Sequence, residues 1–245
     1  MKKLVVFMLT MVMVFSLTAC GGSDDKSDSG SDGGASSGTE SGADSGSGAS
    51  DGSDLEYVKD KGTLVVGITD FEPMDDKGDG DEWIGFDADM AKAFAESIGV
   101  EAEFVEIDWD NKIMELDGKT IDCVWNGMTL TDEVTSAMEC SNAYCNNAQV
   151  VIVPASEADK YQDTDSLSDL SFAVEAGSAG EAAVAALDLE YTPVKAQSDA
   201  LMEVAAGTSS AAVIDSLMAA AMVGEGTGYA DLTYTCGLNY EEYGV

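Results

Sequence analysis

The sequence predicts an α/β fold with two lobes, and three observations support this prediction. Short runs of aliphatic and β-branched residues, such as Thr63–Ile68 and Gln149–Val153, indicate buried strands. Segments with helical spacing of apolar residues alternate with these runs along residues 55–245. Two such series meet near residues 145–155. Because strands that alternate with helices form mostly parallel sheets covered on both faces, each series predicts one α/β lobe.

A helix in the first series follows the first strand. Met90, Phe94 and Ile98 recur every four residues after Asp87, and Gly99 follows them. This pattern predicts an amphipathic helix that ends before the glycine. The same reasoning predicts strands at residues 102–107, 121–125 and 149–153, and a short helix at residues 111–116.

The second series has its own helix signals. Ser178 and Glu181 form a capping box that opens an alanine-rich helix. Ser198 is the predicted cap of a further helix, and Gly207 ends it. Strands are predicted at residues 171–175, 191–194 and 211–214.

The N-terminal segment predicts export from the cell. Lys2 and Lys3 precede the apolar run Leu4–Leu17, which is too short to cross a hydrocarbon core of about 30 Å as a helix. The run ends in Leu17-Thr18-Ala19-Cys20, which is similar to the processing motif of bacterial lipoproteins. Residues 1–19 are therefore predicted to be a signal peptide, and Cys20 is predicted to carry lipid.

Residues 20–54 are predicted to be the lipidated cysteine and a disordered tether. They consist almost entirely of Gly, Ser, Asp and Ala, so they cannot bury enough apolar surface to offset the cost of ordering. A lipid anchor followed by a tether places the remaining chain at the extracellular face of the bacterial cell membrane.

Composition excludes several classes of function. The chain has 47 acidic residues and 11 basic ones, all of them lysine, and a formal net charge of −36. Such acidity argues against binding to nucleic acid or to anionic lipid. The chain has no histidine, so a general base of that type is excluded.

No cofactor and no metal site are expected. Four cysteines follow Cys20, and their spacing matches no zinc pattern. Two of them, Cys140 and Cys145, either pair outside the cell or remain as thiols. The four are Cys123, Cys140, Cys145 and Cys236.

Candidate site residues follow the predicted strands, because ligands bind parallel sheets at the carboxyl ends of strands. These segments supply aromatic rings, hydroxyl groups, backbone amides and carboxylates, without a pair of nucleophile and base. This set suits the binding of a small polar molecule. The segments are Asp70-Phe71, Asp108-Trp109, Asn126-Gly127-Met128-Thr129, Gly177-Ser178 and Asp215.

Six stretches of the sequence carry a resemblance to a known family. They are KGTLVVGITDFEPM, IGFDADMAKAFAESIGVEAEFVEIDWDNKIMEL, IDCVWNGMTLTDEV, SNAYCNNAQVVIV, AAVIDSLMAA and EEYGV. In these stretches the chain resembles the bacterial extracellular solute-binding proteins of family 3, the polar amino-acid receptors of ABC importers. The resemblance runs from about Tyr57 to Val245. It implies a clamshell like that of type II periplasmic binding proteins, which closes on a small polar ligand by hinge bending, and a membrane permease as partner. Lobe 1 would comprise residues 55–145, lobe 2 residues 146–233, and residues 234–245 would return to lobe 1.

The resemblance assigns roles to the candidate residues. It implies that Phe71 and Trp109 enclose the carbon chain of the ligand, and that Asp215 pairs with its α-ammonium group. Polar groups near two loops would hold the carboxylate of the ligand, partly through amides at a helix N-terminus. These groups belong to Asn126, Gly127, Thr129, Gly177 and Ser178. Two further acids, Asp70 and Glu175, are expected to face the cleft.

The chain departs from the family pattern in two ways. Val134 stands where the family has an arginine that grips the carboxylate, and the chain contains no arginine. Without it the site is expected to lack a positive charge, and a carboxylate would rest on neutral donors alone. The ligand is expected to be an amino acid or a cationic amine. Any ligand should be cationic or have a masked carboxylate, and an acidic amino acid is not expected to bind. The chain also looks truncated at its C-terminus by comparison with the family, which would leave apolar surface of lobe 1 uncovered.

Two other functions compete with the receptor. A dehydratase-like enzyme on the same fold needs an acid–base pair, for which Glu175 and Asp215 are the candidates. A surface lipoprotein without a small-molecule ligand, including a degenerate receptor, would need no such site. The sequence favours a receptor without catalytic activity.

Overall fold

The first sheet forms around β1 (Thr63–Ile68), whose residues Leu64, Val66 and Ile68 are buried. A computed structural model describes residues 53–78, 80 and 82–245 of the chain. In this part, β1 pairs in parallel with β4 (Glu101–Glu106) on one side and with β5 (Cys123–Val124) on the other. The three strands confirm the predicted parallel sheet of the first series.

The predicted signal peptide, the predicted lipid site Cys20 and nearly all of the predicted tether lie outside the described residues. Ser53 and Asp54 are described, and Asp54 is the first residue of a helix. Ser53 caps α1 (Asp54–Lys61), because its side chain accepts a hydrogen bond from the backbone N–H of Glu56. The described fold therefore begins just before the predicted tether boundary at residue 54.

Helix α2 (Phe86–Ile98) forms where the sequence predicted it and ends at Gly99, which has the left-handed backbone conformation. The face that packs on the sheet differs from the predicted one. Ala88, Ala91 and Ala95 are buried, whereas Met90 and Phe94 are 43% and 45% exposed. The prediction failed because it took the largest apolar side chains to face the core.

The outward-facing residues of α2 line an apolar groove on the first lobe. The ring centroids of Phe94 and Trp125 lie 6.0 Å apart on its wall. An exposed apolar surface of this kind was expected for the first lobe. The groove is lined mainly by Leu55, Val58, Leu64, Met90, Phe94, Ile98, Cys123, Trp125, Tyr144 and Val245.

The second sheet has five strands in the order β10-β9-β11-β8-β12. Strands β9, β10 and β11 are parallel as predicted, whereas β8 runs antiparallel to both of its neighbours, β11 and β12. The bounds are β8 (Gln149–Pro154), β9 (Ser171–Glu175), β10 (Glu190–Val194), β11 (Ala211–Asp215) and β12 (Leu232–Gly237).

Helices cover both faces of the second sheet. Val184 of α5 (Ala179–Ala186) packs with Val151 and Phe172 on one face. On the other face, α6 (Gln197–Ala206) and α7 (Ser216–Met222) contribute their apolar side chains to a second cluster. Gly207 ends α6 as predicted, but the N-cap is Ala196 rather than Ser198.

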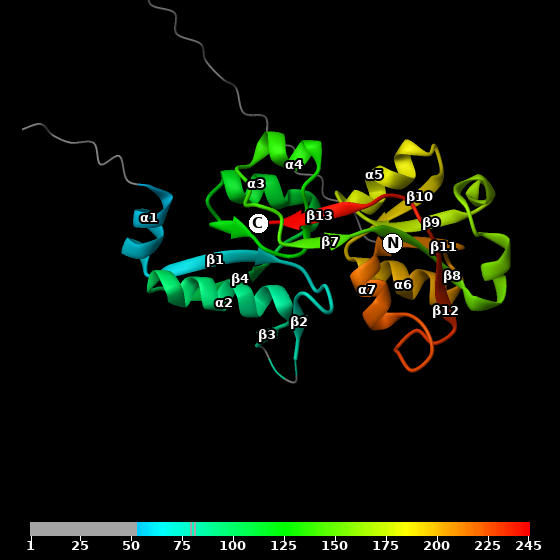
Figure 1. Cartoon of the computed structure of the whole chain (residues 1–245), viewed down its shortest axis with the longest axis horizontal. Coiled ribbons are helices and arrows are strands. Elements are labelled where there is room, and N and C mark those ends of the chain that lie inside the picture. Colours follow the sequence, from blue (N-terminus) through cyan, green and yellow to red (C-terminus); the bar gives the residue numbers. More distant parts are fainter. Residues whose placement is uncertain (1–52, 79, 81) are drawn as a thin grey trace, which may run out of the picture. The chain divides into compact units, whose positions relative to one another are not determined.

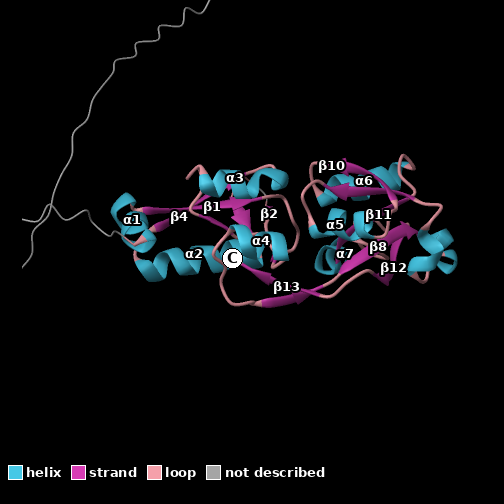
Figure 2. Ribbon diagram, turned by 90° about the horizontal axis from the view of Figure 1, so that it is seen from above, coloured by secondary structure: helices cyan, strands magenta, loops and turns pink. Residues whose placement is uncertain are grey.

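Two antiparallel strands connect the lobes. The first lobe comprises the sheet of β1 with α1, α2, α3 (Lys112–Asp117) and α4 (Asp132–Ala137). The second lobe comprises β8–β12 with α5–α7. β7 (Cys145–Asn147) leads into the second lobe, and β13 (Glu241–Gly244) returns from it (Figures 1 and 2). β13 also pairs with β6 (Met128–Thr129). The predicted lobe boundary at residue 145 falls in β7, and the second sheet extends to Gly237, past the predicted boundary at residue 233.

Short elements complete the described part of the chain. All four described cysteines are free, including Cys140 and Cys145. No described helix is both long and apolar enough to cross a membrane. The short elements are β2 (Asp76–Lys77), β3 (Trp83–Ile84), η1 (Trp109–Asn111), α3 (Lys112–Asp117), α4 (Asp132–Ala137), η2 (Ala155–Lys160) and η3 (Thr164–Leu167).

The two faces of α2 give a direct test of its orientation. We expect Ala91→Glu to lower the free energy of unfolding by at least about 3 kcal/mol, because it buries an unpaired charge. Phe94→Glu should lower it by about 1 kcal/mol or less, because that side chain is already half exposed. Phe94→Glu should also reduce the fluorescence of the dye ANS, which binds exposed apolar surface. Urea unfolding and dye titration measure both effects, and equal destabilisation by the two variants would contradict this orientation.

Candidate functional site

A cavity of about 220 Å³ lies where the ends of β1, β9 and β11 meet loops of both lobes. It is smaller than the roughly 300–1,000 Å³ of pockets for drug-sized ligands, so it suits a small solute. Nine of the ten predicted binding residues line it, namely Phe71, Trp109, Asn126, Gly127, Thr129, Glu175, Gly177, Ser178 and Asp215.

The tenth predicted residue, Asp70, does not line this cavity, and it is exposed. It stands one position before Phe71, and successive side chains of an extended segment point in opposite directions. Val134 lines the cavity and is buried, as expected for the position where the family places an arginine. Met128, which belongs to a candidate segment, also lines the cavity. The sequence analysis did not identify the other lining residues, which are Thr69, Lys112, Thr131, Asp132, Glu133, Gln149, Ala179, Ala182 and Gln197.

Two aromatic side chains form apolar walls. Phe71 and Trp109 are 3% and 8% exposed. Phe71 makes an edge contact with Tyr243, with ring centroids 6.4 Å apart. Gly127 lies against this ring: its φ is 55°, and a Cβ atom there would lie 2.4 Å from Phe71. Only glycine fits between these constraints, so the aromatic wall and the 126–129 loop determine each other's position.

The carboxyl group of Asp215 lies at the floor of the cavity and accepts hydrogen bonds from four protein side chains. Its Oδ1 atom accepts from Gln149 at 3.0 Å, from Tyr243 at 2.6 Å and from Asn147. Its Oδ2 atom accepts from Gln197. Because a carboxylate has about four lone-pair directions, Oδ2 keeps room for one further donor.

Asp215 belongs to a larger acidic cluster. The Oε1 atom of Glu241 accepts hydrogen bonds from Asn147 at 2.7 Å, from Gln149 at 2.8 Å and from the hydroxyl group of Thr129 at 2.9 Å. Burial raises the pKa of Asp215, and the charge of Glu241 raises it further. Thr129, a predicted ligand donor, is therefore occupied by a protein acceptor.

Glu175 is the second acid of the floor and is only 3% exposed. Burial raises the pKa of its carboxyl group to about 8, and the negative charge of Asp215 adds to the effect. A hydrogen bond from Gln197 and the charge of Lys112 act in the opposite direction. The negative charge of the cavity floor is therefore best neutralised, either by protonation of its acids or by a bound cation.

Lys112 places a positive charge in the cavity, which corrects the expectation that the site lacks one. It is the first residue of α3, and its side chain is 7% exposed. Its Nζ atom donates hydrogen bonds to the backbone oxygens of Gly177 at 2.8 Å and Trp109 at 3.3 Å. The ammonium group lies 4.9 Å from the centre of the Trp109 ring. The expectation failed because it considered only position 134.

The surroundings of Lys112 decide its charge state. Burial lowers the pKa of its ammonium group, whereas the negative charges of nearby acids raise it. These acids come from both lobes, in the order Glu133, Glu175, Asp110 and Glu181. Burial has the larger effect, so the pKa of Lys112 lies below its ordinary value, while the acids and the Trp109 ring favour the charged form.

Several predicted donors are already occupied within the protein. The side chain of Asn126 accepts from the backbone N–H of Thr69 at 2.5 Å and donates to Asp75 at 2.8 Å. The backbone N–H of Gly127 donates to Asp87 at 2.6 Å. These two residues therefore hold the loop in place, and the structure does not leave them as donors for a ligand.

The same is true of the predicted helix N-terminus. The backbone N–H of Gly177 donates to the carboxylate of Glu181 at 2.7 Å, and the hydroxyl oxygen of Ser178 accepts from the N–H of Glu181 at 3.1 Å. The first amides of α5, at Ala179 and Gly180, have no carbonyl partner within the helix. Ala179 lines the cavity, so this end of α5 still favours a negative charge.

Comparisons with known proteins identify the family and the fold. A model of the bacterial extracellular solute-binding proteins, family 3, matches residues 64–216. The arginine-binding extracellular protein ArtP of Bacillus subtilis is 29% identical over 89% of this chain and 75% of its own length. Arginine-bound ArgBP from T. maritima superposes with a TM-score of 0.73 at 30% identity, over 78% of this chain and 89% of that chain. The ancestral amino acid-binding protein AncCDT-1, a precursor of cyclohexadienyl dehydratase, gives a TM-score of 0.71 at 31% identity, over 78% and 84%.

The raised pKa of Glu175 predicts how stability depends on pH. Its ordinary pKa is 4.5, and its pKa in the folded protein is about 8. Below pH 4.5 both the folded and unfolded states hold the proton; between pH 4.5 and 8 the unfolded chain releases it first, so stability falls as pH rises. We expect Glu175→Gln to remove up to about 1.4 kcal/mol per pH unit of this slope.

Urea unfolding at pH 5, 6.5 and 8 measures this slope. Glu157→Gln is the matched control, because Glu157 is an exposed residue paired with Lys160 at the surface. A wild-type slope that Glu175→Gln leaves intact would show that Glu175 does not hold its proton in the folded protein.

Proposed function

The chain belongs to the bacterial extracellular solute-binding proteins, family 3, and on this premise we propose that it binds a free amino acid of neutral or positive charge. The observation that carries the proposal is the arrangement of charge in the cavity. Glu175 and Asp215 form an acidic floor, and Lys112 supplies a cation on another wall of the same cavity. A zwitterion presents both charges over a short distance, so it matches such a site.

The charge balance of the cavity favours basic over acidic ligands. Besides the two floor acids, Asp132 and Glu133 line the cavity. Among the described lining residues, Lys112 is the one with a positively charged side chain. The faces of Phe71 and Trp109 suit an aliphatic chain or a guanidinium group, which is attracted to aromatic rings. Among the similar proteins, ArtP is named for arginine, and ArgBP was solved with arginine bound. An arginine-like or lysine-like ligand therefore fits best, with a cationic amine as the nearest alternative.

We propose that the protein delivers this ligand to the membrane permease of an ABC importer. Such delivery needs a cleft that opens and closes, and two contacts between the lobes suit a closed form. Lys112 of the first lobe bonds to Gly177 of the second. Lys195 of the second lobe pairs with Asp108 of the first at 3.3 Å, at the surface. The paired strands β7 and β13 would serve as the hinge.

Calorimetric titration of arginine, lysine, putrescine and glutamate tests the proposal. We expect arginine and lysine to bind and glutamate not to bind, because the floor of the cavity is acidic. Glu175→Gln should weaken the binding of arginine by on the order of tenfold, the effect of losing one charged hydrogen-bond partner. Asp70→Asn is the control, because this acid lies outside the cavity and its loss should leave the affinity unchanged.

The outcomes separate the competing functions. Tight binding of glutamate would contradict the charge argument. The absence of binding by all four compounds would favour a surface lipoprotein without a small-molecule ligand.

We propose a binding protein rather than an enzyme, because four protein donors occupy the carboxyl group of Asp215 and leave it little freedom as a general base. Conversion of a cyclohexadienyl acid, followed by NMR, would instead support a dehydratase.

Anchoring is a separate part of the proposal. We propose that Cys20 becomes the lipidated N-terminus after cleavage, on the strength of the motif Leu17-Thr18-Ala19-Cys20. Cys20→Ser should then move the protein from the membrane fraction to the medium, because one residue supplies the lipid attachment. Cys236→Ser is the matched control and should stay with the membrane. Retention of the Cys20→Ser variant in the membrane fraction would rule out this mode of anchoring.

A further inference from the structure

We infer that Lys112 anchors the carboxylate of the bound amino acid, and that it thereby selects amino acids over the corresponding amines. The inference rests on the proposed function and adds a residue to it. It assigns to α3 of the first lobe a role that the sequence pattern places at position 134, where this chain has valine.

The first argument is the scarcity of positive charge. Among the described residues that line the cavity, Lys112 is the one with a positively charged side chain. The whole chain contains no arginine. Val134 lines the same cavity, but its side chain offers no hydrogen-bond donor. A carboxylate that enters the cavity therefore has one full positive charge available to it from these residues.

The second argument is the number of donors. An ammonium group has three N–H donors and no acceptor. Two of the donors of Lys112 have partners, the backbone oxygens of Gly177 and Trp109. These two bonds and the Trp109 ring fix the position of Nζ, and the third donor remains for a ligand. A lysine whose position is fixed in this way loses little further freedom when it binds an anion.

The third argument is the neighbourhood of the ammonium group. Its partner Gly177 directly precedes Ser178, the N-cap of α5, so Lys112 lies beside the N-terminus of that helix. A helix N-terminus and an ammonium group both favour a negative charge. Glu175 and Asp215 line the same cavity, with Glu175 near enough for its charge to act on Lys112, and they favour the ammonium end of the ligand. The two ends of an amino acid thus have separate partners.

A purely structural role for Lys112 makes a different prediction. If the residue only holds the lobes together through Gly177, its loss should weaken all ligands alike. If it binds the carboxylate, its loss should matter only for ligands that have one. Two pairs of compounds differ by this group alone: arginine and agmatine, and lysine and cadaverine.

The experiment measures the affinity of wild type and Lys112→Met for these four compounds by calorimetry. We expect wild type to bind each amino acid about 10- to 100-fold more tightly than its amine, which is the range for one hydrogen bond to a charged group. Lys112→Met should lose this preference and bind the amines as well as wild type does or better, since a repelling charge is removed.

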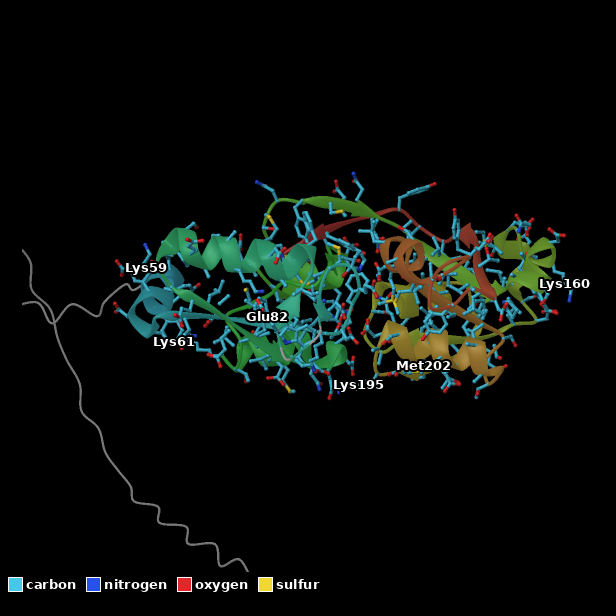
Figure 3. The ribbon with its side chains drawn as sticks, turned by 90° about the horizontal axis from the view of Figure 1, so that it is seen from below. Lys59, Lys61, Glu82, Lys160, Lys195 and Met202 are labelled. Carbon is cyan, nitrogen blue, oxygen red and sulfur yellow. The ribbon has the colours of Figure 1, made fainter. Side chains whose placement is uncertain are left out.

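Two further variants and a control sharpen the test. Lys112→Gln keeps a donor toward Gly177 without the charge, so it should also lose the preference if the charge matters. Adding Val134→Arg to Lys112→Met should restore the preference for amino acids, because it supplies a new cation to the same cavity. Lys160→Met is the control for the loss of one lysine, because Lys160 lies at the far end of the second lobe (Figure 3).

Each outcome bears on the inference. A lost preference in Lys112→Met and Lys112→Gln, with an unchanged one in Lys160→Met, supports it. Equal weakening of amino acids and amines would overturn it in favour of a link between the lobes. A preference that survives in Lys112→Gln would also overturn it. If wild type binds none of the four compounds, the proposed function itself fails, and the inference fails with it.

Discussion

The carboxyl group of Asp215 organises the contact between the lobes and the cavity. Its hydrogen-bond partners come from β7, β8, α6 and β13, so one acid at the end of β11 joins the two connecting strands to the second lobe. Tyr243, which donates to Asp215, also contacts Phe71, and thus links the acid to the first lobe. Removing a partner from a buried, hydrogen-bonded acid leaves an unsatisfied polar group, which is costly.

The first lobe repeats this use of buried acids. Asp87 accepts hydrogen bonds from the backbone N–H of Gly127 and from the hydroxyl group of Tyr144, while Asp75 accepts from Asn126. Burial raises the pKa of Asp75 to about 8 and that of Asp87 to about 6. Both lobes thus hold their binding loops with carboxyl groups that are expensive to bury. Such groups weaken the fold as pH rises, and they keep the cavity in a fixed geometry.

The sequence predicted most of the strands, and nine of the ten site residues that it predicted line the cavity, because strand ends converge by topology. It missed Lys112, Gln149 and Gln197, because each becomes a site residue only through contacts between distant segments. Lysine and glutamine on helices or strands have the same local pattern whether they face solvent or a cavity. The face of α2 was also mistaken, since small residues such as Ala91 pack more closely on a sheet than Phe94 does. Local periodicity gives the element, and long-range packing decides its orientation.

The small sheet that joins the lobes has a consequence for biosynthesis. β13 is its central strand, and it follows every other described strand in the sequence, whereas its partners β6 and β7 come more than 90 residues earlier. At translation rates of about 5–20 residues per second, the partners wait several seconds for this strand. During that interval the second lobe, whose elements from β8 to β12 are continuous in sequence, can form its five-stranded sheet first. The cavity would then be the last part of the protein to assemble, because Tyr243 and Glu241 arrive with β13.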